Sequence, residues 1–281
     1  MAKSVAFLGP AGTYTEEAAI LHAPDATRVA CPSLPDVVAA VDSGQVEEAV
    51  GPIENSIAGS INDIVDALIG AQKARIIGEL LLPIDVCLIA PVGTEVVDIR
   101  RVRSKAEALG QCRRFLTEKL PAASLEPYAS TAGAIASLAN EDGSVAALGP
   151  RRAAELSGMG VLQSGVEDRK NNVTRFVVLG REAHERSGRD KTSIVFDFDR
   201  EDAPGLVYAA LKPFADLGIN LTKIESRPTG AKIGVYYFLL DFDGHVQDDN
   251  VQHALTELNR HTTMFKVLGS YPRANLPAAA P

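Results

Sequence analysis

Residues 170–179, with the sequence KNNVTRFVVL, combine side chains that could bind or polarise a substrate with a short apolar run. The run 176–179 is bounded by Gly180 and predicts a buried β-strand. Four polar side chains lie at or before its start: Asn171, Asn172, Thr174 and Arg175. The junction of a rigid strand with a loop is a common place for groups that hold an anion. The structural alternative is a solvated loop with an Asx turn at the asparagine pair.

Small polar side chains also occur at four expected junctions between a strand and a helix. These are residues 9–13 (GPAGT), residues 52–56 (PIENS), Ser104 with Gln111 two turns further on, and Ser130 with Thr131. The N-terminus of a helix offers unpaired N–H groups and a partial positive charge, which suit a carboxylate or a phosphate. We therefore expect a cleft of hydroxyls, amides and one arginine that binds a small anionic metabolite.

Other common kinds of site lack their motifs. Residues 9–12 are not followed by the Gly-Lys-Ser/Thr ending of a phosphate-binding loop, and the chain has no GxGxxG fingerprint. The five histidines are scattered, and no His, Cys and acidic residues share metal-ligand spacing, so we expect no metal site. No nucleophile motif stands out. The residues alone do not define a reaction.

The composition is that of an ordinary globular protein. The 281 residues predict about two domains, and 46% are hydrophobic and 23% charged. A net charge of −8 without a basic stripe argues against nucleic acid as a partner. Three cysteines without CxxC spacing indicate buried thiols in a reducing cytosol. We expect a cytoplasmic protein, because no signal peptide is visible and the longest apolar stretch, 80–90, is too short to span a bilayer.

The first 180 residues alternate short apolar runs with amphipathic segments, which predicts α/β sheets with helices on both faces. Strands are expected at 5–8, 29–31, 49–53, 76–82, 85–90, 102–104, 125–128, 145–148, 161–163 and 176–179. A hydroxyl followed three residues later by an acid predicts helix starts at Thr13, Ser33, Ser60 and Ser104. So many strands predict two lobes within residues 1–181. With crossings near Gly78 and Gly158, lobe 1 comprises about 1–77 and 159–181, and lobe 2 about 78–158.

A charged, aperiodic linker is expected at 182–191, and beyond it the pattern changes. Strands are expected at 192–199, 219–226, 233–243 and 263–271, with helices at 205–217 and 248–260. The order βαββαβ predicts a ferredoxin-like domain over 192–273. The Ala/Pro-rich tail 274–281 is expected to be disordered.

In this order the motifs resemble those of the prephenate dehydratase family. They are GPAGTYT from Gly9, PIENS from Pro52, STA from Ser130 and NVTRF from Asn172. PGLV from Pro204 and INLTKIESRP from Ile219 resemble the ACT regulatory domain, and the whole resemblance covers residues 4–272. Ser104-Lys105 stands where the family usually has Ser-His, residues 148–151 (LGPR) replace a small turn, and Gly205-Leu206-Val207-Tyr208 replaces the family's Gly-Ala-Leu-Val. The implied fold is a two-lobed α/β unit resembling type-2 periplasmic binding proteins, plus an ACT domain.

The implied reaction is loss of water and CO2 from prephenate to give phenylpyruvate, in phenylalanine biosynthesis, without a cofactor. By resemblance the catalytic residues are Thr174, Glu54, Asn55, Ser104 and Gln111. The substrate-binding residues are Thr13, Ser56, Ser130, Thr131, Asn172, Arg175 and Phe176. Thr174 would donate a hydrogen bond to the departing hydroxyl, with the proton arriving through water or an acid such as Glu54. Arg175 would pair with a substrate carboxylate, and a salt bridge to Asp168 is its structural alternative.

For the ACT domain the resemblance implies feedback regulation by L-phenylalanine, bound between the domains of two subunits of a homodimer or homotetramer. The residues implied are Gly205, Leu206, Val207, Asn220, Leu221, Glu225, Ser226, Arg227 and Pro228. A module that serves dimerisation alone is the alternative.

Two other functions stay open. Arogenate dehydratase would act on a substrate that differs only by an amino group, and a non-catalytic amino-acid-sensing protein could share both folds. A transcriptional regulator would need a basic helix-turn-helix, which is not visible. We expect no fused chorismate mutase, because no helical domain precedes residue 4 or follows residue 272.

Overall fold

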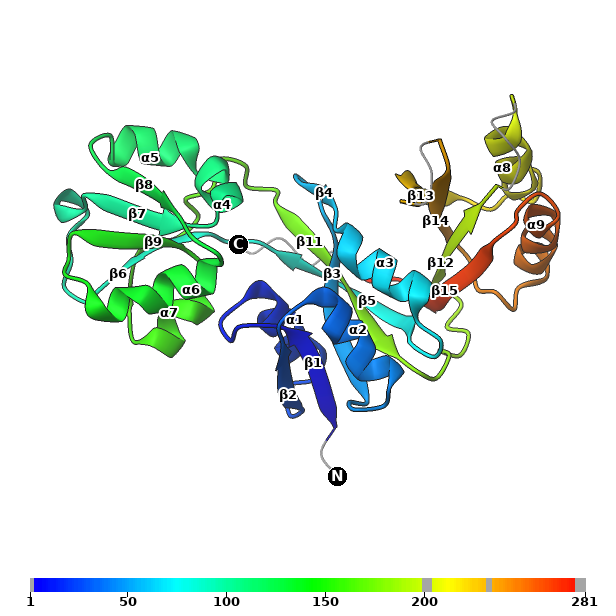
Figure 1. The fold of residues 1–281 in the computed structure, drawn as a ribbon, viewed down its shortest axis with the longest axis horizontal. Helices are drawn as coiled ribbons and strands as arrows, with labels where there is room; N and C mark the ends of the chain where they lie inside the picture. Colours follow the sequence, from blue (N-terminus) through cyan, green and yellow to red (C-terminus); the bar gives the residue numbers. More distant parts are fainter. Residues whose placement is uncertain (1–2, 199–203, 231–233, 276–281) are drawn as a thin grey trace.

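Three β-sheets organise the part of the chain that the structure describes. The structure, a computed structural model, describes residues 3–198, 204–230 and 234–275. Figure 1 shows the first lobe at the centre, the second lobe at the left and the C-terminal domain at the right. Across the ranges described, no helix is both long enough and apolar enough to cross a membrane. The expected end of the strand at 199, the start of the strand at 233 and residues 276–281 of the tail lie outside the described residues.

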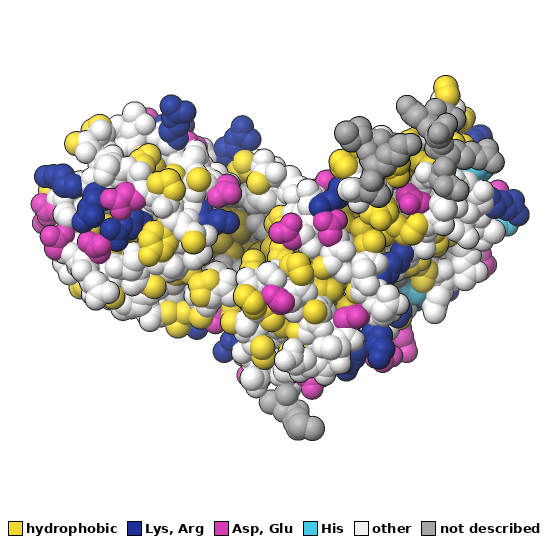
Figure 2. All heavy atoms as spheres, viewed as in Figure 1, with side chains coloured by type: hydrophobic (Ala, Val, Ile, Leu, Met, Phe, Trp, Pro, Cys, Tyr) yellow, Lys and Arg dark blue, Asp and Glu magenta, His cyan; other side chains and the backbone are white. Residues whose placement is uncertain are grey.

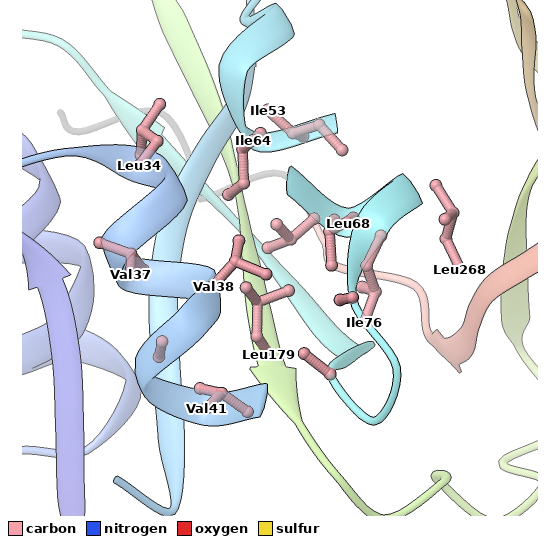
Figure 3. Close-up of a cluster of buried hydrophobic side chains, with 14 of the residues drawn as sticks. Leu34, Val37, Val38, Val41, Ile53, Ile64, Leu68, Ile76, Leu179 and Leu268 are labelled. Carbon is pink, nitrogen blue, oxygen red and sulfur yellow. The ribbon is translucent and has the colours of Figure 1, made fainter. Parts of the chain in front are cut away.

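The first lobe is a six-stranded sheet in the order β2-β1-β3-β11-β5, with β4 paired to β3. Its strands are β1 Ser4–Leu8, β2 Thr27–Cys31, β3 Glu48–Asn55, β4 Gly59–Ser60, β5 Arg75–Pro83 and β11 Val173–Gly180. Its helices are α1 Tyr14–His22, α2 Leu34–Asp42 and α3 Asn62–Gly70. One face of the sheet packs under α1, through Phe7, Ala19 and Phe176. The other face packs under α2 and α3, where Figure 3 shows Val38, Ile64, Leu68 and Leu179 close together.

The second lobe is a five-stranded sheet in the order β10-β6-β9-β7-β8. Its strands are β6 Cys87–Ala90, β7 Arg101–Ser104, β8 Ser124–Pro127, β9 Val145–Gly149 and β10 Gly160–Gln163. Its helices are α4 Ala106–Gln111, α5 Arg113–Lys119, α6 Thr131–Ala136 and α7 Arg151–Ser157, with short 3-10 turns at Val96–Asp98 and Ser137–Asn140. The two lobes thus confirm the α/β fold, and every strand expected between residues 5 and 179 is present; β4 was not expected.

The chain crosses between the lobes at residues 84–86 and 164–172. The predicted crossings near Gly78 and Gly158 are wrong. Gly78 lies inside β5, opposite Val178 of β11, and Gly158 ends α7 in the left-handed conformation with φ of +66°. Both glycines serve local backbone geometry, which sequence cannot distinguish from a domain boundary.

Two of the four predicted helix starts carry the expected cap. Thr13 Oγ1 accepts from the Glu16 amide at α1, and Ser33 Oγ accepts from the Asp36 amide at α2. The other two are wrong by one residue, because α3 and α4 follow Ile61 and Lys105 without a side-chain cap. The hydroxyls of Ser60 and Ser104 have tertiary partners instead: Glu225 for Ser60 and the Leu148 carbonyl for Ser104.

The C-terminal domain has the predicted βαββαβ order. Its elements are β12 Asp190–Asp197, α8 Leu206–Asp216, β13 Leu221–Pro228, β14 Tyr236–Asp243, α9 Asp249–Asn259 and β15 Phe265–Pro272. The antiparallel sheet has the order β13-β14-β12-β15, so β13 is an edge strand. Helices α8 and α9 pack on one face through Phe214, Leu258 and Phe242. This is the ferredoxin-like arrangement that the sequence predicts.

The opposite face of the C-terminal sheet packs on the first lobe. Leu268 and Tyr271 belong to the same buried cluster as Leu68 and Ile76, and Figure 3 shows Leu268 beside this part of the lobe. At Gly269 the two backbones almost touch, since a Cβ there would lie 2.0 Å from the Ile76 carbonyl oxygen. Only glycine allows this approach of β15 to β5.

Candidate active site

The two sheets present their strand ends to each other. In the first lobe, parallel β1 and β3 end at Leu8 and Asn55, and in the second lobe parallel β7 and β9 end at Ser104 and Gly149. The crossing segments connect these two edges, since Cys87 at the start of β6 pairs with Gly149. Figure 2 shows a depression in the molecular surface between the second lobe, at the left, and the rest of the molecule. Ligands of α/β proteins commonly bind at the carboxyl ends of parallel strands.

Asn55 and Thr174 form the centre of the polar site. They lie directly opposite each other on β3 and β11, and Asn55 Nδ2 donates to Thr174 Oγ1 over 2.9 Å. Asn55 Oδ1 accepts from the amides of Ile57 and Ala58, so its side chain has one orientation only. The donated bond occupies a lone pair of Thr174 and leaves its hydroxyl hydrogen free. Thr174 can therefore act as a hydrogen-bond donor towards the cleft.

The polar chain continues from Asn55 to the second lobe. Asn55 Nδ2 also donates to Asn172 Oδ1 over 2.7 Å, and Asn172 Nδ2 donates to Gln111 Oε1 over 3.3 Å. Gln111 ends α4, whereas Asn172 ends the second crossing. Four predicted site residues from both lobes are thus brought together in one hydrogen-bonded series. A β-bulge in β3, at the register shift between Arg175 and Phe176, lies beside it.

Ser56 braces this site, and the other predicted residues make local contacts in their own elements. Ser56 Oγ donates to the Asn171 carbonyl over 3.1 Å and accepts from the Val173 amide over 2.9 Å, which fixes the entry to β11. Thr13 caps α1, and Ser130 caps α6 by accepting from the Gly133 amide. Ser104 is fully buried and joins β7 to β9. Thr131 is the first residue of α6.

Arg175 is not in the cleft, which corrects its prediction as a substrate ligand. Successive side chains on a strand point to opposite faces, so Arg175 points away from Thr174. Its Nε donates to Glu79 over 2.7 Å, its Nη1 to Asp241 over 2.6 Å and its Nη2 to the Tyr271 hydroxyl over 2.8 Å. The alternative partner Asp168 accepts instead from the Arg114 amide.

Glu54 and Phe176 are also outside the cleft. Glu54 contacts Arg175 Nη1 at 3.4 Å and Lys223 Nζ at 3.5 Å, on the face towards the C-terminal domain. Because it lies on that face, Glu54 cannot reach the Thr174 side of the sheet to supply the proton suggested for it. Phe176 is 1% exposed in the core beneath α1, so it supports the sheet rather than a ligand.

Contacts that join the lobes were missed by sequence reasoning. The Tyr14 hydroxyl donates to the Asp85 carbonyl of the first crossing over 2.9 Å, and burial raises the pKa of Tyr14 well above its usual value. Gly12, with φ of +84°, lies against α7, since a Cβ there would be 2.9 Å from the Ala153 Cα. The GPAGTYT motif contains both residues, but nothing local in it indicates a partner in the second lobe.

The cysteines agree with the sequence prediction. Cys31, Cys87 and Cys112 are free and buried. Burial raises the pKa of the Cys87 thiol to about 11 and that of Cys112 to about 12, so neither is a reactive thiolate at neutral pH. Among the described residues, no three His, Cys, Asp or Glu side chains lie where they could hold a metal ion.

The residues predicted to bind phenylalanine divide between two faces of β13. Glu225 contacts Ser60 and Arg227 contacts Asp66, so both side chains point to the first lobe. Ser226 and Pro228 lie exposed on the opposite face, together with Ile224. Gly205 caps α8 with φ of +89° ahead of Leu206 and Val207. Leu221 opens β13, and Asn220 donates to Asp243 over 3.0 Å.

This fold and site define a two-lobed α/β protein with a polar series of side chains where the lobes meet and a separate ferredoxin-like domain. A family model described as prephenate dehydratase matches residues 5–184, and an ACT domain model matches residues 193–260. The chain belongs to the prephenate dehydratase family and carries an ACT domain.

Three similar proteins cover nearly the whole chain. A prephenate dehydratase of Mycolicibacterium gilvum is 38% identical over 294 residues, which cover 99% of this chain and 93% of the relative. The structure of an Arthrobacter aurescens prephenate dehydratase in complex with L-Phe has a TM-score of 0.88 at 39% identity, covering 96% of this chain and 90% of that one. The structure of GqqA, described as a novel type of quorum quenching acylase, has a TM-score of 0.86 at 30% identity, covering 96% and 98%.

Proposed function

We propose that the chain removes water and CO2 from prephenate to give phenylpyruvate, with Thr174 assisting the departing hydroxyl. The contact between Asn55 and Thr174 carries this proposal, because it leaves the hydroxyl hydrogen of Thr174 free at the edge of the cleft. Both residues lie in the segment matched by the family model.

The chemistry needs orientation and one well-placed donor. The ring carboxylate leaves as CO2, its electron pair enters the ring, and the hydroxyl on the opposite ring carbon departs as the ring becomes aromatic. A hydrogen bond from Thr174 stabilises the charge that develops on the departing oxygen. An aliphatic hydroxyl is a poor acid, and Glu54 faces the other side of the sheet, so the proton comes through water.

Substrate recognition is assigned to the polar groups at the strand ends. Asn172 and Gln111 join the lobes around the substrate, and closure of the second lobe excludes water. Ser104, Ser130, Thr131, Thr13 and Ser56 stay proposed as cleft residues, in positions fixed by the caps and braces described above.

We further propose feedback inhibition by L-phenylalanine in a cytoplasmic homo-oligomer. The effector would bind between ACT domains of two subunits, at Gly205, Leu206, Val207, Asn220, Leu221, Ser226 and Pro228. The Arthrobacter relative was solved in complex with L-Phe, which supports this assignment. The unpaired edge of β13 and the exposed side chains of Val207 and Ile224 offer a surface for a second copy.

The test is turnover of prephenate by the purified chain, with and without L-phenylalanine and with arogenate in parallel. Phenylpyruvate is followed by its absorbance in alkali. Turnover of prephenate that L-phenylalanine lowers supports both parts of the proposal. Turnover of arogenate alone would assign the chain to that substrate, and turnover of neither would favour the amino-acid-sensing function.

A further inference from the structure

Two neighbouring cross-strand pairs on β3 and β11 face opposite sides of the first-lobe sheet. Asn55 pairs with Thr174 and faces the cleft, whereas the adjacent Glu54 pairs with Arg175 and faces the ACT domain. Each residue of the candidate catalytic pair is therefore covalently next to a residue that contacts the ACT domain. The two pairs cannot move independently, because their members are consecutive residues on each strand.

Arg175 is the residue of these four that reaches furthest into the ACT domain. It is 8% exposed and reaches both Asp241 on β14 and Tyr271 on β15 of the ACT sheet. On the lobe side it holds Glu79 of β5, whose carboxylate also accepts from Lys191 Nζ over 2.8 Å. Removing one partner of such a buried ion pair leaves an uncompensated charge, so the contact fixes how the ACT sheet sits on β11.

The hydrogen bonds around Arg175 lead to Asp241 by two routes, one direct and one through Tyr271 and Ser193. Arg175 donates to the Tyr271 oxygen, Tyr271 donates to Ser193 Oγ over 2.6 Å, and Ser193 donates to Asp241 Oδ1 over 2.6 Å. Burial raises the pKa of Tyr271, so its hydroxyl stays a donor. Asp241 is 1% exposed and closes the ring by accepting from Arg175. Every polar group in the ring is paired, which makes it a rigid link.

Glu54 is linked to the strand that carries part of the proposed effector site. Lys223 of β13 lies 3.5 Å from Glu54 and donates to Ser60 of β4 over 2.7 Å. Lys223 precedes Glu225–Pro228 on the same strand. A shift of β13 on binding an amino acid therefore acts on Glu54 directly, one residue from Asn55.

We propose that Arg175 and Glu54 are positioning residues through which the ACT domain sets the geometry of the Asn55–Thr174 pair. This rests on the proposed function. A displacement of Asp241 or Lys223 relative to the lobe turns β3 and β11 at these positions and lengthens the bond between Asn55 and Thr174. The hydroxyl of Thr174 then loses its orientation, and turnover falls without a change in the groups that hold the substrate.

The test compares Asp241→Asn and Lys223→Met with the wild type and with Lys266→Met. Lys266 also joins the ACT sheet to the lobe, by donating to the Leu68 and Ile69 carbonyls at the end of α3, but it does not touch Arg175 or Glu54. Three quantities are measured for each protein: kcat and KM for prephenate, the ratio of turnover without and with saturating L-phenylalanine, and the Kd of L-phenylalanine by calorimetry.

We expect Asp241→Asn and Lys223→Met to bind L-phenylalanine with a Kd within about threefold of the wild-type value. The ratio of turnover without and with L-phenylalanine should be at least fivefold smaller than in the wild type, and so closer to one. Basal kcat should fall in Asp241→Asn with little change in KM, and Lys266→Met should keep the wild-type ratio. The inference is overturned if both variants keep that ratio, or if they lose L-phenylalanine binding. A wild type without prephenate turnover would instead remove the proposed function itself, and this inference with it.

Discussion

The amide nitrogen of Asn55 lies 2.9 Å from the hydroxyl oxygen of Thr174, which faces it from the neighbouring strand. Because the amide is oriented by two backbone donors, it cannot turn to accept a bond from Thr174 instead. The donor direction at the site is thus set by the backbone of residues 57 and 58. The Thr174 hydroxyl accepts from Asn55 and has its hydrogen available for another acceptor.

Replacing Thr174 with Ala should lower kcat by about 10²–10³ and leave KM nearly unchanged, because the lost bond forms with the departing oxygen and not with the bound substrate. Steady-state kinetics with prephenate measure both constants. Thr174→Ser keeps the hydroxyl and is the control, which should retain most of the turnover. An alanine variant with wild-type kcat would exclude Thr174 from the reaction.

Replacing Asn55 with Asp should lower kcat by about a hundredfold at neutral pH, since a carboxylate accepts where the amide donates. The hydrogen of Thr174 would turn towards the new carboxylate and away from the substrate. The Ile57 and Ala58 amides would favour the ionised form of the new carboxylate, so the loss of turnover should persist from pH 8 to pH 5. A variant with wild-type turnover at neutral pH would contradict this donor assignment.

Replacing Gly269 with Ala should lower the free energy of unfolding by about 1–3 kcal/mol, because the new methyl group would lie 2.0 Å from the Ile76 carbonyl oxygen and must push β15 off β5. Gly70→Ala is the control, since a Cβ at Gly70 meets open space within 4 Å. Urea unfolding of the three proteins gives the comparison. Equal midpoints for Gly269→Ala and the wild type would show that the ACT sheet does not rest on the lobe at this point.

Asp42 should stabilise the fold in a pH-dependent way. Hydrogen bonds from the Ala74 and Lys73 amides, with a further one from Gln72, lower the pKa of Asp42 below its usual value. A carboxyl whose pKa is lower in the folded state stabilises above its unfolded-state pKa of about 3.9 and loses this effect as the pH falls through the folded-state pKa.

Asp42→Ala should therefore lower the free energy of unfolding by about 1–2 kcal/mol at pH 7. This is a moderate value for a charged hydrogen-bond acceptor near the surface. The difference from the wild type should shrink as the pH falls from about 5 to about 3. Urea unfolding at a series of pH values measures it. A difference that grows in acid would mean that the carboxylate is not the stabilising form.

The sequence was sufficient to predict the fold, because strands and helices are recognised from the local periodicity of apolar residues. Alternating strands and helices predicted the lobes, and the βαββαβ order predicted the ACT domain. The lobe crossings were misplaced because glycine marks both turns and boundaries, and Gly158 only ends a helix. A local sequence pattern does not show which of several glycines marks the crossing from one lobe to the other.

The site was predicted in part for a similar reason. Period-two alternation implies that Thr174 and Arg175 face opposite sides of β11, but not which side is the cleft. The partner that decides this for Arg175 is Asp241, 66 residues along the chain in another domain. Glu54 was misassigned in the same way, since its cationic partner Lys223 also lies in the ACT domain.

The second crossing ends at Asn172, only two residues before Thr174. If the second lobe rotates about a hinge at Asn172, Thr174 hardly moves. Gln111, which lies in the second lobe, moves with that lobe. The Thr174 hydroxyl, which we propose as the hydrogen-bond donor in the reaction, would then keep its alignment with Asn55, and the long bond from Asn172 to Gln111 would break. Under the proposed function, product would leave by a hinge movement that preserves the contact between Asn55 and Thr174 for the next substrate.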